Sequence, residues 1–453
     1  MTPPLPPAER SRSCGEPRRN TTMNRRLKRI LFIANGHSVH AQEWLRLLEG
    51  TGWDVHAFVG GAVPPCRIDA TFHTLDTTAS NPAANRVKPF WPMRRGVARV
   101  CRLRFGDGPN AESRRLAALI RRLRPAVVHS LRLQDEGYTA LGAVDAIRDV
   151  GAAWVVSLWG SDLAWFGELP GHRDRIRSVM AACDCVLADC RRDLELSRLF
   201  GAAEHQIGLP EAIPGNGGLD PATIRGRIQI ADPVRRRVIL FPHARDDRFH
   251  RFTPVLAALR DARAALRGLM LVFLGADEAS RRAIACLSPE LPCRCIVCDH
   301  RPREEVFDWL ARSRAVVKPS LSDGTPNVML ESMAAGALPV LSPIASIREW
   351  IDDGINGLLA ANDDVPALAR AVARACLDDA LLPQAAVQNA AIVAARADRR
   401  LVRGKVLDLY ERLLRGGGRV PGFGDESEAP ARASRHPRRA ETVIAEAESC
   451  VSS

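Results

Sequence analysis

The feature that most constrains the fold is an alternation of short apolar runs with amphipathic stretches, which occurs in two series along the chain. Strand-sized apolar runs fit 29–34, 55–59, 126–129, 153–158 and 185–188 in the first series, and 238–241, 269–274, 295–297, 315–317 and 338–341 in the second. Helical spacing fits 41–48, 114–123, 136–150, 253–265, 303–311, 327–335 and 365–376. Alternating units of this kind are typical of parallel sheets covered by helices on both faces.

A Pro- and Gly-rich stretch, 209–220 (LPEAIPGNGGLD), separates the two series and indicates a linker. We therefore expect two doubly wound, Rossmann-like α/β domains facing each other across a cleft. The predicted ranges are 27–213 for the first domain, 214–395 for the second, and 396–415 for a helix that returns to the first. We expect 1–26, a basic segment, and 416–453 to be disordered, because they hold few large apolar side chains. Translation starting at Met1 and at Met23 are both compatible with this pattern.

Composition excludes several classes of protein. The 453 residues are 46% apolar and 26% charged, which is ordinary globular usage and argues against a disordered or fibrous chain. No run reaches the roughly 18 apolar residues of a membrane span, and no apolar signal core follows the basic N-terminus. We therefore expect a cytoplasmic protein whose 12 Cys are reduced.

The net charge of +12 is concentrated in two places, the N-terminal tail and the segment 86–124, where twelve Lys and Arg stand against Asp107 and Glu112. Such a segment favours an anionic partner, meaning phospholipid, nucleic acid or a phosphorylated substrate. Arginines spread over solvated helix faces explain it equally well.

Common phosphate-binding motifs are absent from the sequence. There is no G-x-x-x-x-G-K-[ST] and no G-x-G-x-x-G after the first strand, which argues against a P-loop NTPase and a standard dinucleotide enzyme. The first strand leads instead into Asn35, Gly36 and His37. Gly36 would let the backbone approach a ligand at the carboxyl end of that strand, where open α/β sheets bind ligands, although an ordinary turn fits as well.

The most informative stretch is 318–340, KPSLSDGTPNVMLESMAAGALPV. Pro326 stands where a helix is expected to begin, since Pro is favoured at the first helical position. The N–H groups of Thr325, Asn327 and Val328 would then form an anion site at the helix N-terminus. Asp323 precedes this helix, and Glu331 lies one turn inside it. The spacing lets the two carboxylates border one ligand, with a diphosphate between them.

This stretch resembles glycosyltransferase family 4, the retaining nucleotide-sugar transferases of GT-B fold. That family has an acidic pair spaced E-x7-E, and here Asp323 stands in place of the first Glu. The resemblance extends to Asn216 in 214–220 (PGNGGLD), to 355–359 (INGLL), and to 156–162 (VSLWGSD), where Trp159 replaces the family's His. It covers nearly the whole of 29–415.

The resemblance implies a function and roles for individual residues. We expect transfer of a sugar from an NDP-sugar donor, with UDP and GDP both open, to a glycan or lipid-linked hydroxyl acceptor, with retention and without metal or cofactor. The pathway would be cell-envelope polysaccharide or lipopolysaccharide synthesis. Asp323 would contact donor-sugar hydroxyls and Glu331 the ribose, and these two would form the catalytic pair. The remaining donor-binding residues would be Gly36, Asn216, Arg245, Arg248, Gly324, Thr325, Asn327 and Val328, and the acceptor side would hold His37, Trp159 and Asp162.

Within that set, Arg245 and Arg248 stand for the Arg and Lys with which the family clamps the diphosphate, and Arg251 competes with Arg248. Metal is not expected at 293–300, because its C-x-C-x2-C-x-H spacing is cramped and lacks a second ligand pair.

Other functions remain open at this point. One is a GT-B nucleotide-sugar epimerase. Another is a non-enzymatic basic protein that binds membrane or nucleic acid, although paired carboxylates repel a phosphate backbone, so nucleic acid is not expected. Aromatics interleaved with arginines in 88–104 favour peripheral binding to an anionic membrane surface, such as the inner face of the cytoplasmic membrane.

Overall fold

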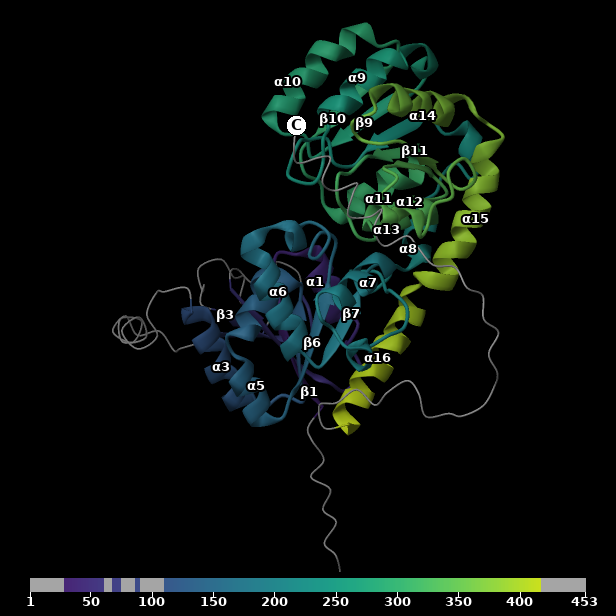
Figure 1. The fold of residues 1–453 in the computed structure, drawn as a ribbon. Coiled ribbons are helices and arrows are strands. Elements are labelled where there is room, and N and C mark those ends of the chain that lie inside the picture. The colour runs from purple at the N-terminus through teal and green to yellow at the C-terminus, as the bar shows by residue number, and fades with distance from the viewer. Residues whose placement is uncertain (1–27, 61–66, 75–85, 90–109, 417–453) are drawn as a thin grey trace, which may run out of the picture. The chain divides into compact units, whose positions relative to one another are not determined.

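The computed structural model describes residues 28–60, 67–74, 86–89 and 110–416 (Figure 1). Both predicted tails, apart from Gly416 at the end of the last helix, lie outside these residues. So does most of the aromatic and basic stretch between 88 and 104.

The first half of the chain builds a seven-stranded sheet in which all paired strands are parallel. Its strands are β1 (Arg29–Ile33), β2 (Asp54–Val59), β3 (Thr71–Thr74), β4 (Arg86–Pro89), β5 (Val127–Leu131), β6 (Ala153–Leu158) and β7 (Cys185–Ala188), in the order β4-β3-β2-β1-β5-β6-β7. Strands β3 and β4 were not predicted, because TFHT and RVKP lack the apolar run that marks the others.

The second half builds a six-stranded parallel sheet. Its strands are β8 (Val238–Phe241), β9 (Met270–Leu274), β10 (Arg294–Cys298), β11 (Ser313–Lys318), β12 (Leu338–Leu341) and β13 (Leu358–Leu359), in the order β10-β9-β8-β11-β12-β13. The prediction of two parallel α/β sheets is confirmed.

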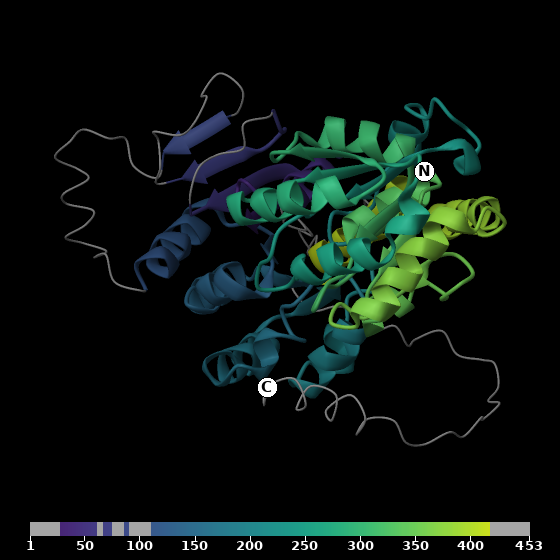
Figure 2. The same cartoon turned by 90° about the horizontal axis from the view of Figure 1, so that it is seen from above.

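Helices cover both faces of these sheets (Figures 1 and 2). In the first half they are α1 (Val39–Arg46), α3 (Ala111–Leu123), α4 (Tyr138–Leu141), α5 (Val144–Val150), α6 (Pro170–Ala182) and α7 (Arg191–Leu199). In the second half they are α8 (Pro221–Arg225), α9 (Thr253–Asp261), α10 (Glu278–Leu287), α11 (Arg303–Arg312), α12 (Asn327–Ala335), α13 (Ala345–Arg348), α14 (Val365–Leu377), α15 (Leu381–Arg396) and α16 (Arg399–Arg415). Each sheet has an apolar cluster on either face, as buried parallel strands require.

One predicted helix is wrong. The range 136–150 was expected to be continuous, but the chain forms a turn at Leu133–Gly137, then α4, then α5. Gly142 ends α4, and a Cβ on it would lie 2.4 Å from Ser113 Oγ, so α3 packs too closely there for a side chain. A glycine in mid-helix also costs about 1 kcal/mol relative to Ala, which favours the break.

Helix α16 belongs to the core of the first sheet, although it is the last helix in sequence. Its residues Val406, Leu409 and Tyr410 are buried in the same cluster as Phe32 of β1. Trp44 Nε1 donates to the Tyr410 hydroxyl at 3.1 Å, and that hydroxyl lies 2.7 Å from His129 Nδ1. Burial lowers the pKa of His129 to about 3, so the ring is neutral and accepts from Tyr410. The first domain is therefore assembled from both ends of the described chain.

The chain crosses between the two halves twice, and the crossings lie side by side. Leu219 N donates to Ala397 O and Arg399 N donates to Leu219 O, both at 2.9 Å. Gly218 has a φ of +82°, and a Cβ there would lie 2.7 Å from Ala397 O. A glycine is needed at this position on both counts.

Strand order places the functional loops. In the first sheet the order reverses between β1 and β5, and in the second between β8 and β11. Ligands of open α/β sheets bind outside the carboxyl ends of the strands at such points. The loops that follow β1, β5, β8 and β11 are therefore where a site is expected.

Candidate active site

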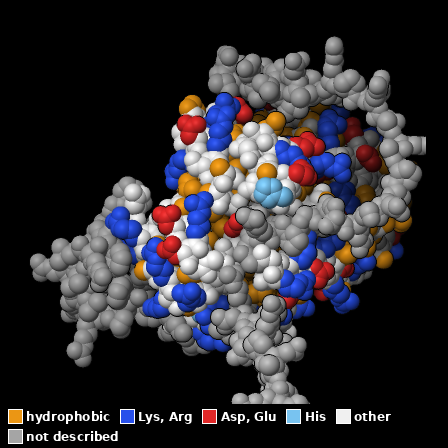
Figure 3. Space-filling view, turned by 60° about the horizontal axis from the view of Figure 1, so that its bottom comes forward, with side chains coloured by type: hydrophobic (Ala, Val, Ile, Leu, Met, Phe, Trp, Pro, Cys, Tyr) orange, Lys and Arg blue, Asp and Glu red, His pale blue; other side chains and the backbone are white. Residues whose placement is uncertain are grey.

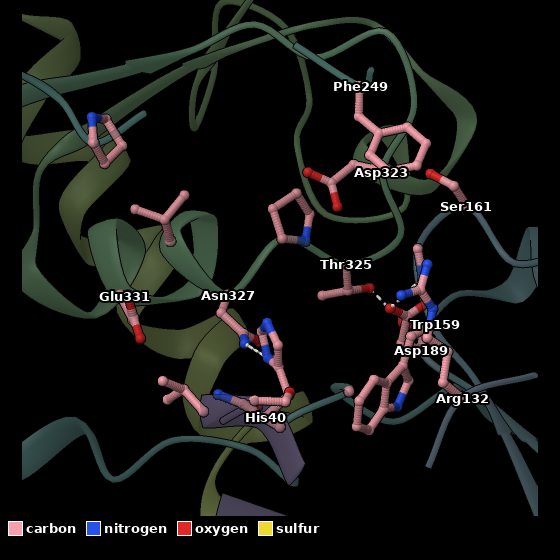
Figure 4. A pocket seen from close by; sticks show the side chains of 18 of the residues that line it. His40, Arg132, Trp159, Ser161, Asp189, Phe249, Asp323, Thr325, Asn327 and Glu331 are labelled. Carbon is pink, nitrogen blue, oxygen red and sulfur yellow. Dashed lines mark hydrogen bonds between the residues drawn. The ribbon is translucent and has the colours of Figure 1, made fainter. Parts of the chain in front are cut away.

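A cavity of about 630 Å³ lies where these four loops meet. Its lining includes Asn35 after β1, Glu136 after β5, His250 after β8 and Asp323 after β11. Seven of the residues singled out from the sequence line it, namely Trp159, Asn216, Asp323, Thr325, Asn327, Val328 and Glu331. Figure 4 shows Asp323 and Glu331 well apart, with Thr325 and Asn327 between them. This is the arrangement that the spacing of the two acids predicted.

Asp323 is held at the end of β11 by a cation that the sequence interpretation overlooked. Its Oδ2 lies 2.5 Å from Lys318 Nζ, and its Oδ1 accepts from Gly324 N at 3.0 Å. Burial raises the pKa of the Asp323 carboxyl, but the charge and hydrogen bond of Lys318 outweigh it, so the pKa lies below its usual range. The carboxylate is ionised at neutral pH and partly exposed to the cavity.

Glu331 lies on α12 and forms an ion pair that reaches across to the first domain. Arg303, the first residue of α11, lies 3.2 Å from Glu331 and 3.1 Å from Glu43 of α1. Burial raises the pKa of the Glu331 carboxyl, and Arg303 limits the rise. Arg303 was missed as a site residue because only the fold brings it between two acids that are far apart in sequence.

The start of α12 presents unpaired amides to the cavity. Among the residues that the structure describes, the N–H groups of Thr325, Asn327 and Val328 have no acceptor. Pro326 is the N-cap and offers no side-chain acceptor, so nothing within the helix satisfies them. Unpaired amides at a helix N-terminus bind anions.

A carboxyl group of the first domain packs against this turn. Asp189 Oδ2 accepts from Gly160 N at 3.1 Å, and the Asp189 carbonyl accepts from Thr325 Oγ1. A Cβ on Gly324 would lie 2.3 Å from the Asp189 carboxyl oxygens. Gly324, which was expected to bind the donor, is not part of the cavity lining. Because it has no side chain, the two domains can touch at this point.

The opposite wall carries aromatic and amide groups. Trp159 lines the cavity, and neither its Nε1 nor the Nδ2 of Asn216 has a hydrogen-bond partner among the described residues. His40 lies beside Trp159, with ring centroids 5.8 Å apart, and contacts Asn327 of the second domain. Unpaired buried donors facing a cavity are available to a ligand.

The turn after β5 is strained and carries an unusual acid. Arg132 has a φ of +126° and Asp135 a φ of +53°, conformations that non-glycine residues seldom adopt. Burial raises the pKa of the neighbouring Glu136 to about 8, and its Oε2 has no partner among the described residues. Strain of this kind concentrates at functional sites. Periodicity alone predicted an ordinary helix start here and gave no sign of it.

Two expected acceptor-side residues do not reach the cavity. His37 is exposed and lies outside the lining, while Asp162 is fully buried. Asp162 accepts from Leu133 N and Trp159 N at 3.0 Å and pairs with Arg132 at 3.1 Å. It therefore fixes two loops that line the cavity without facing it.

The glycine expected on the donor side also falls outside the lining. Gly36 is buried, and its carbonyl accepts from Gln42 Nε2 at 3.0 Å. The residues that flank this turn, Asn35 and Ser38, line the cavity in its place.

The expected arginine clamp is absent from the lining. Arg245 lies beside Gly275, Arg248 stacks over the Phe166 ring at 5.7 Å, and Arg251 donates to Asp247 O at 2.7 Å. Asp246 and Asp247 accept hydrogen bonds from backbone N–H groups within the loop after β8. The resulting loop conformation leaves the three arginines outside the lining. The residues of this loop that line the cavity are Pro242, Phe249 and His250.

His250 is fixed by a chain of hydrogen bonds. Its Nδ1 lies 2.9 Å from Asp247 Oδ1, and Asp247 Oδ2 lies 2.7 Å from His243 Nε2. Asp247 also accepts from the backbone N–H of Phe249 and of His250. The hydrogen bonds from Phe249 N–H and from the two imidazoles keep the pKa of the Asp247 carboxyl well below the usual range despite burial. The other ring nitrogen of His250, Nε2, lies 4.0 Å from Asp323 Oδ2 and has no hydrogen-bond partner among the described residues.

Two clusters in the described part of the chain bring three potential metal ligands within 4.8 Å of one another, namely His243, Asp247 and His250, and Asp189, Cys190 and Asp193. In the first cluster each imidazole is hydrogen-bonded to a different oxygen of Asp247. In the second, Asp193 is paired with Arg192 at 2.9 Å. In the structure, hydrogen bonds hold the side chains of the first cluster in place, and this ion pair holds Asp193 of the second.

Comparison with solved structures identifies the class of this fold. Sucrose-phosphate synthase from Thermosynechococcus elongatus superposes with a TM-score of 0.62 at 15% identity, over 86% of this chain and 99% of that one. HepE of Anabaena, solved with UDP and with UDP-glucose, superposes with a TM-score of 0.60 at 13% identity, over 84% of this chain and 99% of that one. The fold is that of the GT-B glycosyltransferases, as expected.

Sequence comparison finds a family resemblance in the second domain. The family model "Glycosyl transferases group 1" matches residues 237–378, which contain both Asp323 and Glu331. A D-inositol 3-phosphate glycosyltransferase of Xylanimonas cellulosilytica is 25% identical over 229 residues, which are 47% of this chain and 54% of that protein. The chain thus spans about half the length of this curated relative. The expected resemblance to group 1 glycosyltransferases is confirmed.

Within the described residues, no helix is both long enough and apolar enough to cross a bilayer.

Proposed function

We propose that this protein transfers a sugar from a nucleoside-diphosphate sugar to a hydroxyl group of a glycan or lipid-linked acceptor, with retention of anomeric configuration and without a metal ion. One observation carries the proposal. Two carboxylates, Asp323 and Glu331, border the unpaired amides at the start of α12 inside a cavity built by both domains. The chemistry of a nucleotide sugar matches this order of groups, with hydroxyls at each end and a diphosphate between them.

Each part of the cavity has a role in this proposal. Asp323 accepts hydrogen bonds from the donor sugar, Glu331 accepts them from the ribose, and the α12 amides hold the diphosphate. These amides stabilise the charge that develops on the diphosphate as the bond to the anomeric carbon breaks. The acceptor enters beside Trp159 and Glu136, where Glu136, uncharged at neutral pH, meets a hydroxyl without repelling a phosphorylated group. The cavity's own residues do this charge work, which supports a metal-independent reaction.

Nucleotide binding tests this proposal directly. We expect at least one of UDP, GDP, ADP and UDP-glucose at 1 mM to raise the unfolding temperature of the full-length protein, because a ligand that binds only the native state stabilises it. At 100 times its dissociation constant, a ligand adds about 2.7 kcal/mol. No shift with any of the four would contradict the proposal. Incubation with a nucleotide sugar and no acceptor distinguishes an epimerase from a transferase. An epimerase would convert the sugar of the donor into its epimer, which NMR of the recovered donor would detect.

We also propose that the acceptor is presented at an anionic membrane surface, in the synthesis of cell-envelope polysaccharide or lipopolysaccharide. The support is the sequence of 88–104 together with the exposed arginines Arg114 and Arg122 of α3. Each Lys or Arg near an anionic bilayer contributes about 1 kcal/mol. On the face drawn in Figure 3, basic side chains lie among acidic ones. Membrane binding would therefore depend on a local cluster of basic residues rather than on a uniformly basic surface.

Vesicle co-sedimentation measures this membrane binding. The protein is expected to pellet with anionic vesicles at low salt and to stay in solution at high salt, because salt screens the charges. Changing Arg94, Arg95, Arg99, Arg102 and Arg104 to Gln should abolish pelleting. A control with Arg281 and Arg282 of α10 changed to Gln should pellet like the unmodified protein. If both variants pellet equally, the segment 88–104 does not anchor the protein to the membrane.

A further inference from the structure

Within the described residues, each Lys and Arg that lines the cavity is paired with a carboxylate, so an incoming diphosphate meets no unpaired cation from this part of the chain. Four Lys and Arg side chains line the cavity, and each has a carboxylate partner: Arg132 with Asp162, Arg301 with Glu305, Arg303 with Glu331, and Lys318 with Asp323. Arg245 and Arg248, which were expected to supply free charge, lie outside the lining. A diphosphate adds at least two negative charges to this balance. The amides at the start of α12 supply partial positive charge, and a full additional charge can come from breaking one of these pairs or from a group that gains a proton.

His250 is the group placed to gain that proton. Its ring lines the cavity, and Nε2 is buried, unpartnered among the described residues, and 4.0 Å from Asp323 Oδ2. The other nitrogen, Nδ1, is fixed against the ionised carboxylate of Asp247. An imidazole held in this way carries its N–H on Nδ1 and a lone pair on Nε2, and the carboxylate behind it stabilises the ring once it is charged.

The surroundings of His250 keep it neutral while the cavity is free of ligand. Burial, then the positive charge of Lys318 and the neighbouring His243, lower the pKa of His250 to about 4, although Asp323 and Asp247 oppose them. These four groups, from the loop of His250 itself, from β11 and from the turn after it, face the ring. A diphosphate beside Nε2 adds negative charge to this set, and an opposite charge within a few ångströms raises the pKa of a histidine.

We propose that His250 takes up one proton at Nε2 when a nucleoside diphosphate or nucleotide sugar enters the cavity, and then donates a hydrogen bond to a diphosphate oxygen. The ring thereby supplies positive charge to the leaving diphosphate only when that group is present. Binding is then coupled to proton uptake and weakens as pH rises. This inference rests on the proposed nucleotide-sugar donor and goes beyond it, because a site with fixed charges would bind the same ligand without taking up a proton.

The other two histidines of the lining do not share this geometry. His300 is exposed, and His40 is in contact with Asn327. Neither has a carboxylate hydrogen-bonded behind its ring among the described residues. His300 therefore provides a matched control for a His-to-Gln change in the same cavity.

Titration calorimetry with UDP, or with whichever of UDP, GDP and ADP stabilises the protein, tests the coupling. At pH 8 the nucleotide itself is fully ionised, so a difference between buffers of low and high ionisation enthalpy reports protons taken up by the protein. We expect the unmodified protein to take up a measurable fraction of a proton per nucleotide, and this fraction should grow as the pH is lowered toward 7. The affinity should fall with rising pH, approaching about tenfold per unit above the pKa of the complex. His250→Gln should remove this uptake, and His300→Gln should retain it.

His250→Lys keeps the test decisive if the Gln variant unfolds. A lysine carries its charge before the ligand arrives, so this variant should bind the nucleotide without His250's proton uptake. Uptake by the unmodified protein that persists in His250→Gln or His250→Lys would overturn the inference. Nucleotide binding without any uptake would also overturn it and would leave the proposed function standing. No binding of UDP, GDP or ADP to the unmodified protein would instead remove the proposed function and this inference together.

Discussion

Changing Glu331 to Gln is expected to weaken nucleoside-diphosphate binding by about 10- to 100-fold, because hydrogen bonds to a charged group contribute about 1.5–3 kcal/mol. Glu331 is buried on α12, faces the cavity and is the candidate for the ribose hydroxyls. The fold should survive the change, since Arg303 keeps its contact with Glu43 at 3.1 Å. Calorimetry gives the affinity, and thermal unfolding verifies that the variant is native.

Glu304→Gln is the matched control for this experiment. Glu304 lies on α11 next to the same Arg303, but its side chain is exposed, pairs with Arg227 and does not line the cavity. We expect its removal to leave nucleotide affinity unchanged. Equal affinity of the Glu331→Gln variant and the unmodified protein would exclude a ribose contact and leave Glu331 as the counter-ion of Arg303.

Changing Asp323 to Asn is expected to lower the rate at which nucleoside diphosphate is released from its sugar by about 100-fold or more. Asp323 is proposed to hydrogen-bond the reacting sugar, and loss of one preorganised hydrogen bond at a reacting centre typically costs about 2.7–4 kcal/mol of transition-state stabilisation. Asp323→Glu should retain activity, because it restores the carboxylate on a longer side chain. The release of nucleoside diphosphate from a nucleotide sugar that stabilises the protein, with water as acceptor, gives the rate without knowledge of the natural acceptor.

The ion pair with Lys318 suggests a second measurement on Asp323. If the carboxylate served only to neutralise Lys318, then Asp323→Asn would destabilise the protein, and the double change with Lys318→Gln would restore both stability and turnover. We expect the double variant to recover stability alone. A fully active Asp323→Asn protein would show that the carboxylate has no part in transfer.

The sequence predicted the part of the cavity formed by α12 better than the rest of it, and the reason is physical. The signals for α12 are local, since Pro326, the apolar spacing and the left-handed Gly336 all act within a dozen residues, and the predicted range 327–335 matches the helix. Asp323 and Glu331 are tied to that helix by spacing, so their placement followed from it.

Residues whose position depends on loops or on distant segments were missed. Arg245 and Arg248 were expected from the family's Arg and Lys positions, but Asp246 and Asp247 accept backbone N–H groups within the loop, and that folding brings His250 to the cavity instead. Lys318 and Arg303 were missed because their role depends on ion pairs with Asp323 and Glu331, which only the folded structure reveals. The strained turn at Arg132 has no signature in composition or periodicity, because its conformation is imposed by tertiary contacts such as that with Asp162.

The place of α16 in the first domain has a consequence for how this protein is made. A ribosome completes β1 to β7 early, but the segment that covers Trp44 and supplies the hydroxyl for His129 emerges only after the whole second domain. Domains generally fold as units during synthesis, so the second domain can complete its fold first, while the earlier one keeps an open apolar groove. A nascent chain halted before residue 399 would carry a folded second domain and an incompletely folded first domain. Chaperone dependence should therefore fall sharply once the last helix is released.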